Sequence, residues 1–356
     1  QKILALSVTA TSIKGGQIKR ADNKSIDFCT NGQHSYWLSS NRINTENSHG
    51  TGCTFASALA ALIAQGYALK DAFVIAKAYI NQGLDKVKSQ QHCQDAIWQG
   101  AWPNNINHYP EVLVKGSTLA TDIDWFAETS QEESSHKVND FDSDFSGVDI
   151  NNFGLYPVVN SLDWLERLLK TGVKLIQYRE KKLVGDDLEQ SIVKAIALGN
   201  QYNAMLFIND HWQLAIKYGA YGVHLGQEDI EQAELTNIKQ AGLRLGISTH
   251  GHYELLKIKQ YKPSYLAIGA IFPTKTKDMT GQIQGVKTLT DLVKLTPDIP
   301  TVAIGGISLN RASAVLTSQV NSIAVVTAIT EAPDPESVIQ QFQQLIQTRK
   351  NREHHA

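Results

Sequence analysis

The amino-acid sequence predicts an α/β protein in which residues 153–350 form a compact (β/α)₈ barrel. Two observations predict this fold. Eight short apolar runs alternate with amphipathic segments within about 200 residues, the count of a small barrel of this kind. The apolar runs are continuous rather than interrupted at every second residue, as in parallel strands that are buried on both faces. An open, doubly wound parallel sheet is the alternative.

Each predicted element follows from its local pattern. The predicted strands are Leu155–Val159, Lys174–Tyr178, Met205–Ile208, Gly222–Leu225, Arg244–Ile247, Tyr265–Ile268, Thr301–Ile304 and Ser322–Val326. The helical patterns between and after them are Leu162–Lys170, Asp187–Gln201, His211–Tyr218, Glu231–Gln240, His252–Gln260, Leu289–Lys294, Leu309–Thr317 and Glu336–Arg349.

An N-terminal segment, about residues 1–121, has a different pattern. Strand-like pieces near Ile3–Val8 and Ser35–Leu38 precede an Ala-rich helix that begins at about Cys53, and a second helix runs from Leu69 to about Leu84. With 356 residues and about 150 residues per domain, the chain has room for such a second domain.

Residues 122–152 are predicted to be an acidic, flexible linker between the two parts. Acidic residues dominate this stretch among Ser, Asn and Gly, and they repel one another: Glu128, Glu132, Glu133, Asp140, Asp142, Asp144 and Asp149. Residues 351–356 are predicted to be a tail. An acidic interaction segment is the alternative for the linker.

Composition excludes several classes of protein. The 33 basic and 35 acidic residues nearly cancel, whereas a non-specific nucleic-acid binder has a basic excess. No run of about 18 apolar residues occurs, so we expect no membrane-spanning helix. The three cysteines, Cys29, Cys53 and Cys93, are too few and too widely spaced for a disulfide framework or a zinc ribbon, which favours the reducing cytoplasm. Small-molecule substrates are the expected partners, and a homo-oligomer is left open as an alternative to a monomer.

Charged residues follow the strands that would end at the barrel mouth, where catalytic groups of this fold lie. Gln177, Arg179 and Lys181 alternate, so a strand would direct all three toward the mouth, where two cations suit an anion. Asp210 and Asp229 follow the next two strands. Paired carboxylates of this kind hold Mg²⁺ and leave its other positions for water and phosphates, although either residue alone would be a helix N-cap.

The remaining strand ends suit a phosphate group. The loop after the sixth strand offers the hydroxyls of Thr274 and Thr276 together with Lys277, and Gly305-Gly306 follows the seventh strand. Loops after strands seven and eight commonly bind phosphate through backbone N–H groups that glycine leaves accessible. His224 and His250 have no partner identifiable from the sequence, and a structural role is expected for both.

These groups predict electrostatic catalysis on two anionic substrates, one of them a diphosphate that needs Mg²⁺. No lysine sits where a Schiff base would form, and no pair of nucleophile and base is recognisable in the sequence. Cations and Mg²⁺ would instead assist the departure of pyrophosphate.

The barrel motifs, in order, resemble those of the thiamine-phosphate synthase family. They are Gln177-Tyr178-Arg179-Glu180-Lys181, Ile208-Asn209-Asp210, Gly222-Val223-His224-Leu225-Gly226-Gln227-Glu228-Asp229, Pro273-Thr274-Lys275-Thr276-Lys277 and Ala303-Ile304-Gly305-Gly306-Ile307. The resemblance implies that hydroxymethylpyrimidine diphosphate and thiazole phosphate condense to thiamine phosphate and pyrophosphate. It also implies a dissociative mechanism, in which the C–O bond breaks before the thiazole nitrogen attacks.

The same resemblance implies a role for each site residue. Asp210 and Asp229 would bind Mg²⁺. The groups around the diphosphate would be Arg179, Lys181, Asn209 and Lys277. Gln177 and Ser248 would lie beside the pyrimidine. The contacts to thiazole phosphate would come from Thr274, Thr276, Gly306, Val326 and Thr327.

The N-terminal motifs resemble the C-terminal part of hydroxymethylpyrimidine (phosphate) kinase, which has a ribokinase-like fold. They are Lys14-Gly15-Gly16 and Asn47-Ser48-His49-Gly50-Thr51-Gly52-Cys53. The resemblance implies that Cys53 occupies the position of the base and that the helix N-terminus holds the transferring phosphate. A helix N-terminus also lowers the pKa of a thiol. The alternative is a glycine-capped helix with a buried, inert cysteine.

Three further interpretations stay open. A longer natural chain could be bifunctional, with an ATP-dependent kinase that feeds the synthase. A barrel similar to thiazole tautomerase would bind thiazole phosphate without condensing it, but would need neither the metal carboxylates nor the cations for the diphosphate. A binding or regulatory barrel would have no turnover.

We predict that the chain as printed lacks kinase activity. The resemblance covers less than half of a kinase of this family, and the rest would supply most of the pyrimidine pocket. Incubating the chain with ATP and hydroxymethylpyrimidine phosphate, and measuring the diphosphate formed, tests this prediction. Robust turnover would contradict it.

Overall fold

The computed structural model describes residues 8–16, 18, 22–88, 96–113, 144–274 and 283–353. The chain divides into two compact units. Unit 1 consists of residues 1–139 and 251–260, and unit 2 of residues 140–250 and 261–356. Residues 3–7 of the strand-like piece predicted near Ile3–Val8, and most of the predicted linker, lie outside the described residues.

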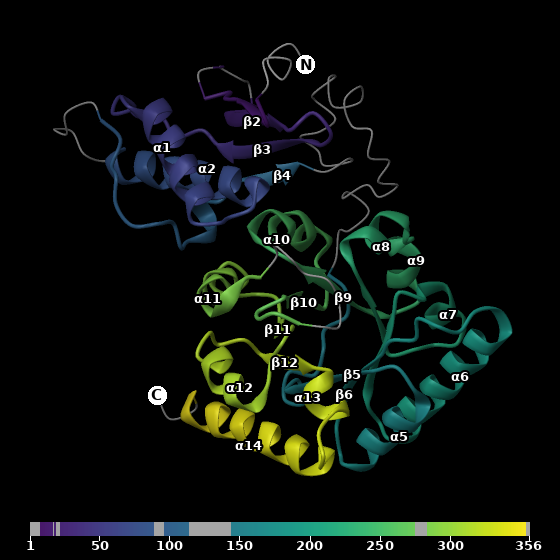
Figure 1. The fold of residues 1–356 in the computed structure, drawn as a ribbon. Coiled ribbons are helices and arrows are strands. Elements are labelled where there is room, and N and C mark those ends of the chain that lie inside the picture. The colour runs from purple at the N-terminus through teal and green to yellow at the C-terminus, as the bar shows by residue number, and fades with distance from the viewer. Residues whose placement is uncertain are drawn as a thin grey trace. The chain divides into compact units, whose positions relative to one another are not determined.

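The strands of unit 2 form a closed, parallel eight-stranded barrel, which confirms the predicted fold and rules out the open sheet (Figure 1). Each strand pairs with its neighbour in sequence, and β12 closes the ring by pairing with β5. The strands are β5 (Leu155–Val159), β6 (Leu175–Tyr178), β7 (Met205–Asn209), β8 (Gly222–Leu225), β9 (Arg244–Thr249), β10 (Tyr265–Ile268), β11 (Thr301–Ala303) and β12 (Ser322–Val325).

Helices follow the strands and lie on the outside of the ring (Figure 1). They are α5 (Leu162–Lys170), α6 (Gly185–Gln201), α7 (Trp212–Lys217), α8 (Gln227–Gln232), α9 (Leu235–Gln240), α11 (Gly285–Lys294), α12 (Leu309–Leu316), α13 (Thr327–Thr330) and α14 (Pro335–Glu353). None of the helices in the described parts of the chain has both the length and the apolarity needed to cross a bilayer.

Local sequence explains why α5 forms where it was predicted. The Ser161 hydroxyl accepts a hydrogen bond from the backbone N–H of Trp164 (3.2 Å), which satisfies a donor that the first turn leaves free. Leu165, Leu168 and Leu169 recur on one face and are buried against the barrel.

Two differences from the predicted helices concern short segments. The single helix expected over 231–240 is instead α8 and α9, because the buried Ala233 between them takes an extended conformation (ψ 144°). Helix α13 was not predicted, since a single turn of four residues is too short to have a periodic pattern.

The barrel interior is filled by side chains that alternate along each strand. Leu175, Phe207 and Tyr265 belong to one buried apolar cluster inside the ring. Strand residues two positions further on also point inward, and they lie nearer the carboxyl ends. Polar residues occupy several of these later positions, so the barrel changes from an apolar floor to a polar mouth.

Residues 144–152 contact the barrel, although the sequence assigned them to the flexible linker. The Phe145 side chain is 4% exposed, and its backbone N–H donates to the carbonyl of Lys262 (3.1 Å). The Ser264 hydroxyl donates to the carbonyl of Ser146 (2.6 Å). These bonds hold the described end of the linker against unit 2.

Unit 1 contains a four-stranded antiparallel sheet and two long helices. The strands, in sheet order, are β1 (Thr11–Ile13), β2 (Lys24–Thr30), β3 (Ser35–Asn41) and β4 (Glu111–Leu113). The helices are α1 (Thr51–Ala64) and α2 (Leu69–Val87), and a 3₁₀ turn, η2, spans Ile106–His108. Helix α10 (His252–Ile258), which the sequence placed among the barrel helices, belongs to unit 1 through its contacts with α2 and β4.

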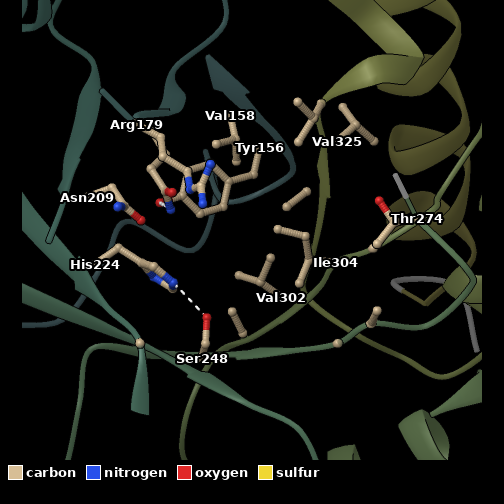
Figure 2. A pocket seen from close by; sticks show the side chains of 18 of the residues that line it. Tyr156, Val158, Arg179, Asn209, His224, Ser248, Thr274, Val302, Ile304 and Val325 are labelled. Carbon is tan, nitrogen blue, oxygen red and sulfur yellow. Dashed lines mark hydrogen bonds between the residues drawn. The ribbon is translucent and has the colours of Figure 1, made fainter. Parts of the chain in front are cut away.

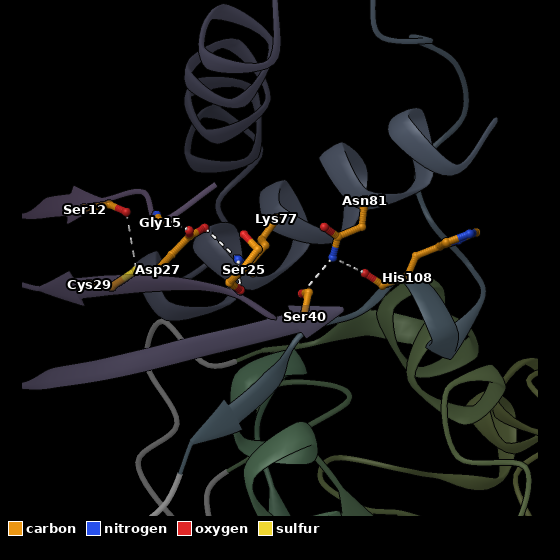
Figure 3. A network of polar contacts seen from close by, with 9 residues as sticks. All are labelled: Ser12, Gly15, Ser25, Asp27, Cys29, Ser40, Lys77, Asn81 and His108. Carbon is orange, nitrogen blue, oxygen red and sulfur yellow. Dashed lines mark hydrogen bonds and ion pairs between the residues drawn. The ribbon is translucent and has the colours of Figure 1, made fainter. Parts of the chain in front are cut away.

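A buried ion pair joins α2 to the sheet of unit 1 (Figure 3). Lys77 Nζ lies 2.9 Å from Asp27 Oδ2, and the two side chains are only 4% and 3% exposed. Lys77 also donates to the carbonyl of Ser25, and Asp27 Oδ1 accepts from the backbone N–H of Gly15. Burial lowers the pKa of Lys77, while Asp27 opposes that shift. The pair therefore holds the turn at Gly15, the strand β2 and the helix α2 together.

Replacing Lys77 by Met is expected to destabilise unit 1 by about 3–5 kcal/mol, because the buried carboxylate of Asp27 loses its counter-charge. Chemical denaturation followed by the exchange of unit 1 amide hydrogens measures this loss. The control is Lys88→Met, which breaks an exposed pair with Asp85 and should cost less than about 1 kcal/mol. Equal effects of the two substitutions would contradict the prediction.

Candidate functional site

A cavity of about 440 Å³ opens at the carboxyl ends of the barrel strands. This is the end at which barrels of this kind bind substrates, and the volume suits small ligands. Eleven residues that the sequence singled out line this cavity: Gln177, Arg179, Lys181, Asn209, Asp210, Asp229, Ser248, Thr274, Gly306, Val326 and Thr327. Thr276 and Lys277 lie outside the described residues, and Cys53 belongs to unit 1.

The turn after β6 supplies the two cations, and the strand itself supplies Gln177. Gln177, Arg179 and Lys181 all line the cavity, as their alternation predicted. Glu180 lies between the cations and is buried. One of its carboxylate oxygens accepts from the backbone N–H groups of Lys181, Lys182 and Leu183, at 2.9, 2.7 and 3.2 Å.

Those three bonds decide the charge of Glu180. Burial raises the pKa of its carboxyl, but the hydrogen bonds from the three backbone amides outweigh burial and lower it. The ionised carboxylate thus fixes the turn that carries Lys181. No pattern in the sequence indicated this role, because a Glu between two cations is equally consistent with a solvated charge.

Two carboxylates lie near each other on the same side of the cavity. Asp210 follows β7 and pairs with Lys181, whose side chain is 49% exposed while that of Asp210 is 14% exposed. Asp229 is in the first turn of α8, where its Oδ2 accepts from the backbone N–H of Gly226 (3.1 Å). Asp229 thus lies inside α8 and bonds the N-cap residue, Gly226, while the N-cap of the helix after Asp210 is His211, so neither aspartate is itself an N-cap. Asp229 also lines the cavity.

The neighbouring charge of Asp210 makes the ionised form of Asp229 costly. Burial raises the pKa of the Asp229 carboxyl, and the repulsion from Asp210 raises it further, while Lys181 opposes this shift. A cation bound between the two carboxylates would remove that repulsion. The described residues contain no cluster of three or more acidic, His or Cys side chains suited to a metal. Two carboxylates nevertheless fit Mg²⁺, which commonly binds one or two carboxylates together with substrate phosphates and water.

Asn209 offers a hydrogen-bond donor to a ligand. Its side chain is 5% exposed, and its Nδ2 is buried without a hydrogen-bond partner in the described parts of the chain. An unpaired buried donor costs free energy, so a bound acceptor at this position would be stabilised. Asn209 adjoins Asp210 and lines the same cavity.

Glycines form the turn on the opposite side of the cavity. Gly305 and Gly306 have φ values of 99° and 63°, a region that other residues rarely adopt. A Cβ at Gly306 would lie 2.5 Å from the carbonyl oxygen of Pro273, so the turn also needs the space. Arg311 donates to the carbonyl of Gly306 (2.7 Å) and fixes its orientation.

The two polar sides are separated by an apolar wall. Figure 2 shows Arg179, Asn209 and His224 on one side and Thr274 on the other, with Val302 and Ile304 between them. This arrangement suits two ligands that each carry an anionic group and that meet over an apolar surface.

His224 and Tyr156 line the cavity although the sequence did not assign them to it. His224 Nε2 lies 2.9 Å from Ser248 Oγ (Figure 2), and its Nδ1 lies 2.8 Å from the hydroxyl of Tyr265. The sequence could have assigned both residues to the cavity from their inward-facing positions on β8 and β5, next to predicted site residues. Both ring nitrogens of His224 are therefore hydrogen-bonded to side chains of other strands, β9 and β10.

The expectation that no pair of nucleophile and base occurs needs a correction. His224 and Ser248 form such a pair in geometry, because parallel pairing of β8 with β9 sets His224 opposite Gly246 and so close to Ser248. Burial lowers the pKa of His224 to about 4, and Arg179 lowers it as well, although Asp210 opposes the shift. So weak a base does not activate a serine at neutral pH.

In unit 1, Cys53 lies in the first turn of α1 and is exposed, so the alternative of a buried, inert cysteine does not hold. Gly50 precedes the helix with a φ of 82°. The local geometry thus agrees with the helix start predicted from the glycine-rich motif.

Comparisons with known proteins match both units. Residues 155–329 match the family model described as thiamine monophosphate synthase, and residues 1–97 match the one described as phosphomethylpyrimidine kinase. The chain is 57% identical over 197 residues to a thiamine-phosphate synthase of Yersinia pestis (strain Pestoides F), which covers 55% of this chain and 92% of the relative. A thiamine-phosphate synthase of Proteus mirabilis is 56% identical over 194 residues, which cover 54% of this chain and 90% of that protein.

A solved structure agrees with these matches. A thiamine phosphate pyrophosphorylase from Pyrococcus furiosus superimposes with a TM-score of 0.51 at 26% sequence identity, covering 56% of this chain and 98% of that one. Through its barrel, the chain belongs to the thiamine-phosphate synthase family of transferases.

Proposed function

We propose that unit 2 joins 4-amino-5-hydroxymethyl-2-methylpyrimidine diphosphate to thiazole phosphate and so forms thiamine phosphate and pyrophosphate. One observation carries this proposal: Arg179, Lys181, Asp210 and Asp229 face a single cavity whose other side is the glycine turn at Gly305-Gly306. The first set suits a diphosphate with its metal, and the second suits a phosphate. The names of the relatives support the same reaction.

The reaction proceeds by dissociation and capture. The bond between the pyrimidine methylene carbon and the diphosphate oxygen breaks, and both electrons leave with pyrophosphate. The thiazole nitrogen then donates its lone pair to the pyrimidine-methyl cation, which forms the new C–N bond. The thiazole ring ends as a thiazolium cation. No proton has to be removed in these steps, so the weak basicity of His224 is no obstacle.

The turn after β6 and the last residue of β7 stabilise the leaving group. Arg179 and Lys181 place positive charge beside the developing pyrophosphate, and the buried amide of Asn209 donates a hydrogen bond to it. Because Glu180 fixes the turn between the two cations, they need little reorganisation when charge develops.

Asp210 and Asp229 would hold Mg²⁺. Bound there, the ion supplies positive charge to the diphosphate and its leaving oxygen. The pair of Lys181 with Asp210 keeps the carboxylate paired before the ion and the diphosphate enter.

The second substrate would bind through its phosphate at the glycine turn. Gly306, Thr274, Val326 and Thr327 line that side of the cavity, and glycine leaves backbone N–H groups accessible to an oxyanion. The apolar wall of Val302 and Ile304 would then position the thiazole ring near the pyrimidine.

The competing functions account for fewer of these groups. A thiazole tautomerase would use the phosphate side of the cavity but neither the carboxylate pair nor Arg179 and Lys181. A serine hydrolase would need a stronger base than His224, whose pKa is about 4. For unit 1, the match to phosphomethylpyrimidine kinase favours a bifunctional protein that uses ATP, should the natural chain be longer. The cysteine content supports a cytoplasmic location.

Incubating the protein with both substrates and Mg²⁺, and measuring pyrophosphate release, tests the reaction directly. In this assay, Asp229→Asn is expected to lower turnover at least about a hundredfold and to raise the Mg²⁺ concentration required. Asparagine still accepts the hydrogen bond from Gly226, so helix α8 should stay capped and the fold intact.

The matched control is Glu228→Gln. Glu228 is exposed, adjoins Asp229 in sequence and does not line the cavity, so this variant should keep wild-type turnover. Absence of pyrophosphate release by the wild-type protein would refute the proposed reaction. Full activity of Asp229→Asn would refute only the metal site.

A further inference from the structure

We propose that a chain of hydrogen bonds inside the barrel selects an aminopyrimidine over an oxopyrimidine by fixing which of its two ends donates and which accepts. The chain consists of Gln177, Tyr156, Tyr265, His224 and Ser248. This inference deepens the proposed function and rests on it in one respect, namely that the cavity holds a pyrimidine ring.

The five side chains are linked one to the next across the barrel. Gln177 Nε2 lies 3.4 Å from the hydroxyl of Tyr156, and the two tyrosine hydroxyls lie 2.7 Å apart. Further bonds then connect Tyr265 to His224 Nδ1 (2.8 Å) and His224 Nε2 to Ser248 Oγ (2.9 Å). The links therefore come from strands that are distant in the sequence but share one interior.

Burial isolates the middle of this chain from water. The Tyr265 and Tyr156 side chains are 0% and 1% exposed, respectively. The ring of Tyr265 occupies space that Gly246 leaves open, since a Cβ there would lie 2.1 Å from the ring. Broken links would leave buried hydroxyls unpaired at a cost in free energy, so the chain is expected to stay fully bonded.

A complete chain of this kind has only two directions of donation. Each tyrosine hydroxyl has one hydrogen to donate, and a neutral imidazole donates from one nitrogen and accepts at the other. If Gln177 Nε2 donates to Tyr156, then Tyr156 donates to Tyr265 and Tyr265 donates to His224 Nδ1. The imidazole must then carry its hydrogen on Nε2 and donate it to Ser248.

Each direction gives the cavity a different pattern of groups. In the direction just described, the amide carbonyl of Gln177 is available as an acceptor, and the Ser248 hydroxyl keeps its own hydrogen for donation. The reverse direction turns the Gln177 amino group and the Ser248 lone pairs toward a ligand instead. Both residues line the cavity, so a ring bound there would form its hydrogen bonds with whichever pattern is present.

The first pattern is complementary to a 4-aminopyrimidine. Its amino group donates and its adjacent ring nitrogen accepts, whereas a 4-oxopyrimidine has a carbonyl acceptor beside a ring N–H donor. In the structure, Gln177 Nε2 is the atom that faces the Tyr156 hydroxyl, so the hydrogen bonds follow the first direction. The carbonyl of an oxopyrimidine would face the carbonyl of Gln177, two acceptors without a hydrogen between them. Its binding would otherwise require all the hydrogen bonds of the chain to reverse direction together.

Calorimetric binding of two ligands tests this selection without the chemical step. The ligands are hydroxymethylpyrimidine monophosphate with its 4-amino group and the counterpart with a 4-oxo group. We expect the wild-type protein to prefer the amino form by about a hundredfold or more, because a site with paired polar groups rejects a mismatched ligand strongly. In Tyr265→Phe, and in Tyr156→Phe, the preference should fall at least about tenfold.

Controls separate this effect from lost packing. Tyr178→Phe removes the hydroxyl of another buried tyrosine, on β6, which bonds Ser191 and is not part of the hydrogen-bond chain. This variant should therefore prefer the amino form as strongly as the wild-type protein does. The affinity for thiazole phosphate should be unchanged in all variants. Because both substitutions break one chain, the double variant Tyr156→Phe/Tyr265→Phe should lose no more preference than either single variant.

Nitrogen NMR of His224 gives a readout independent of any ligand. The proposal requires a neutral imidazole with hydrogen on Nε2, and the opposite tautomer would overturn it. If the wild-type protein makes thiamine phosphate but both single variants keep the wild-type preference for the amino form, the inference is overturned and the proposed function stands. A wild-type protein that binds neither pyrimidine would overturn both.

Discussion

The pairing of eight parallel strands into a closed ring is the constraint on which the site depends. Parallel strands present their carboxyl ends at one rim, and alternate residues point inward. Arg179, Asn209, Ser248 and Gly306 are separated by long stretches of chain, yet all line one cavity as a result. The same alternation puts the large apolar residues below them, so the polar groups rest on a packed floor.

The cavity is built around charges that need a ligand to be well balanced. Asp229 is partly buried beside Asp210, which raises its pKa, and the amide nitrogen of Asn209 is buried without a partner among the described residues. Such features cost folding free energy. In the proposed function a bound cation and diphosphate would offset this cost, which is the pattern of a binding site and not of a structural core.

Buried polar groups find their hydrogen-bond partners in different ways in unit 1 and beneath the cavity of unit 2. Lys77 and Asp27 form a closed pair whose other hydrogen bonds go to backbone groups of β2 and of the turn at Gly15, so the pair holds elements together. The chain through His224 and Tyr265 has two ends at the cavity, so it can transmit a preference to a ligand. The difference lies in whether the last members of the network face solvent-accessible space.

The sequence by itself determined the barrel, most of its strands and the residues at their ends, because hydrophobic periodicity and strand-end position are local properties. It did not reveal the break between α8 and α9, the turn-holding role of Glu180, or the Lys77–Asp27 pair. Only the tertiary structure decided that His224 would bond Ser248 and Tyr265. Those contacts depend on strand register and on the space above Gly246, and no pattern along the chain specifies either.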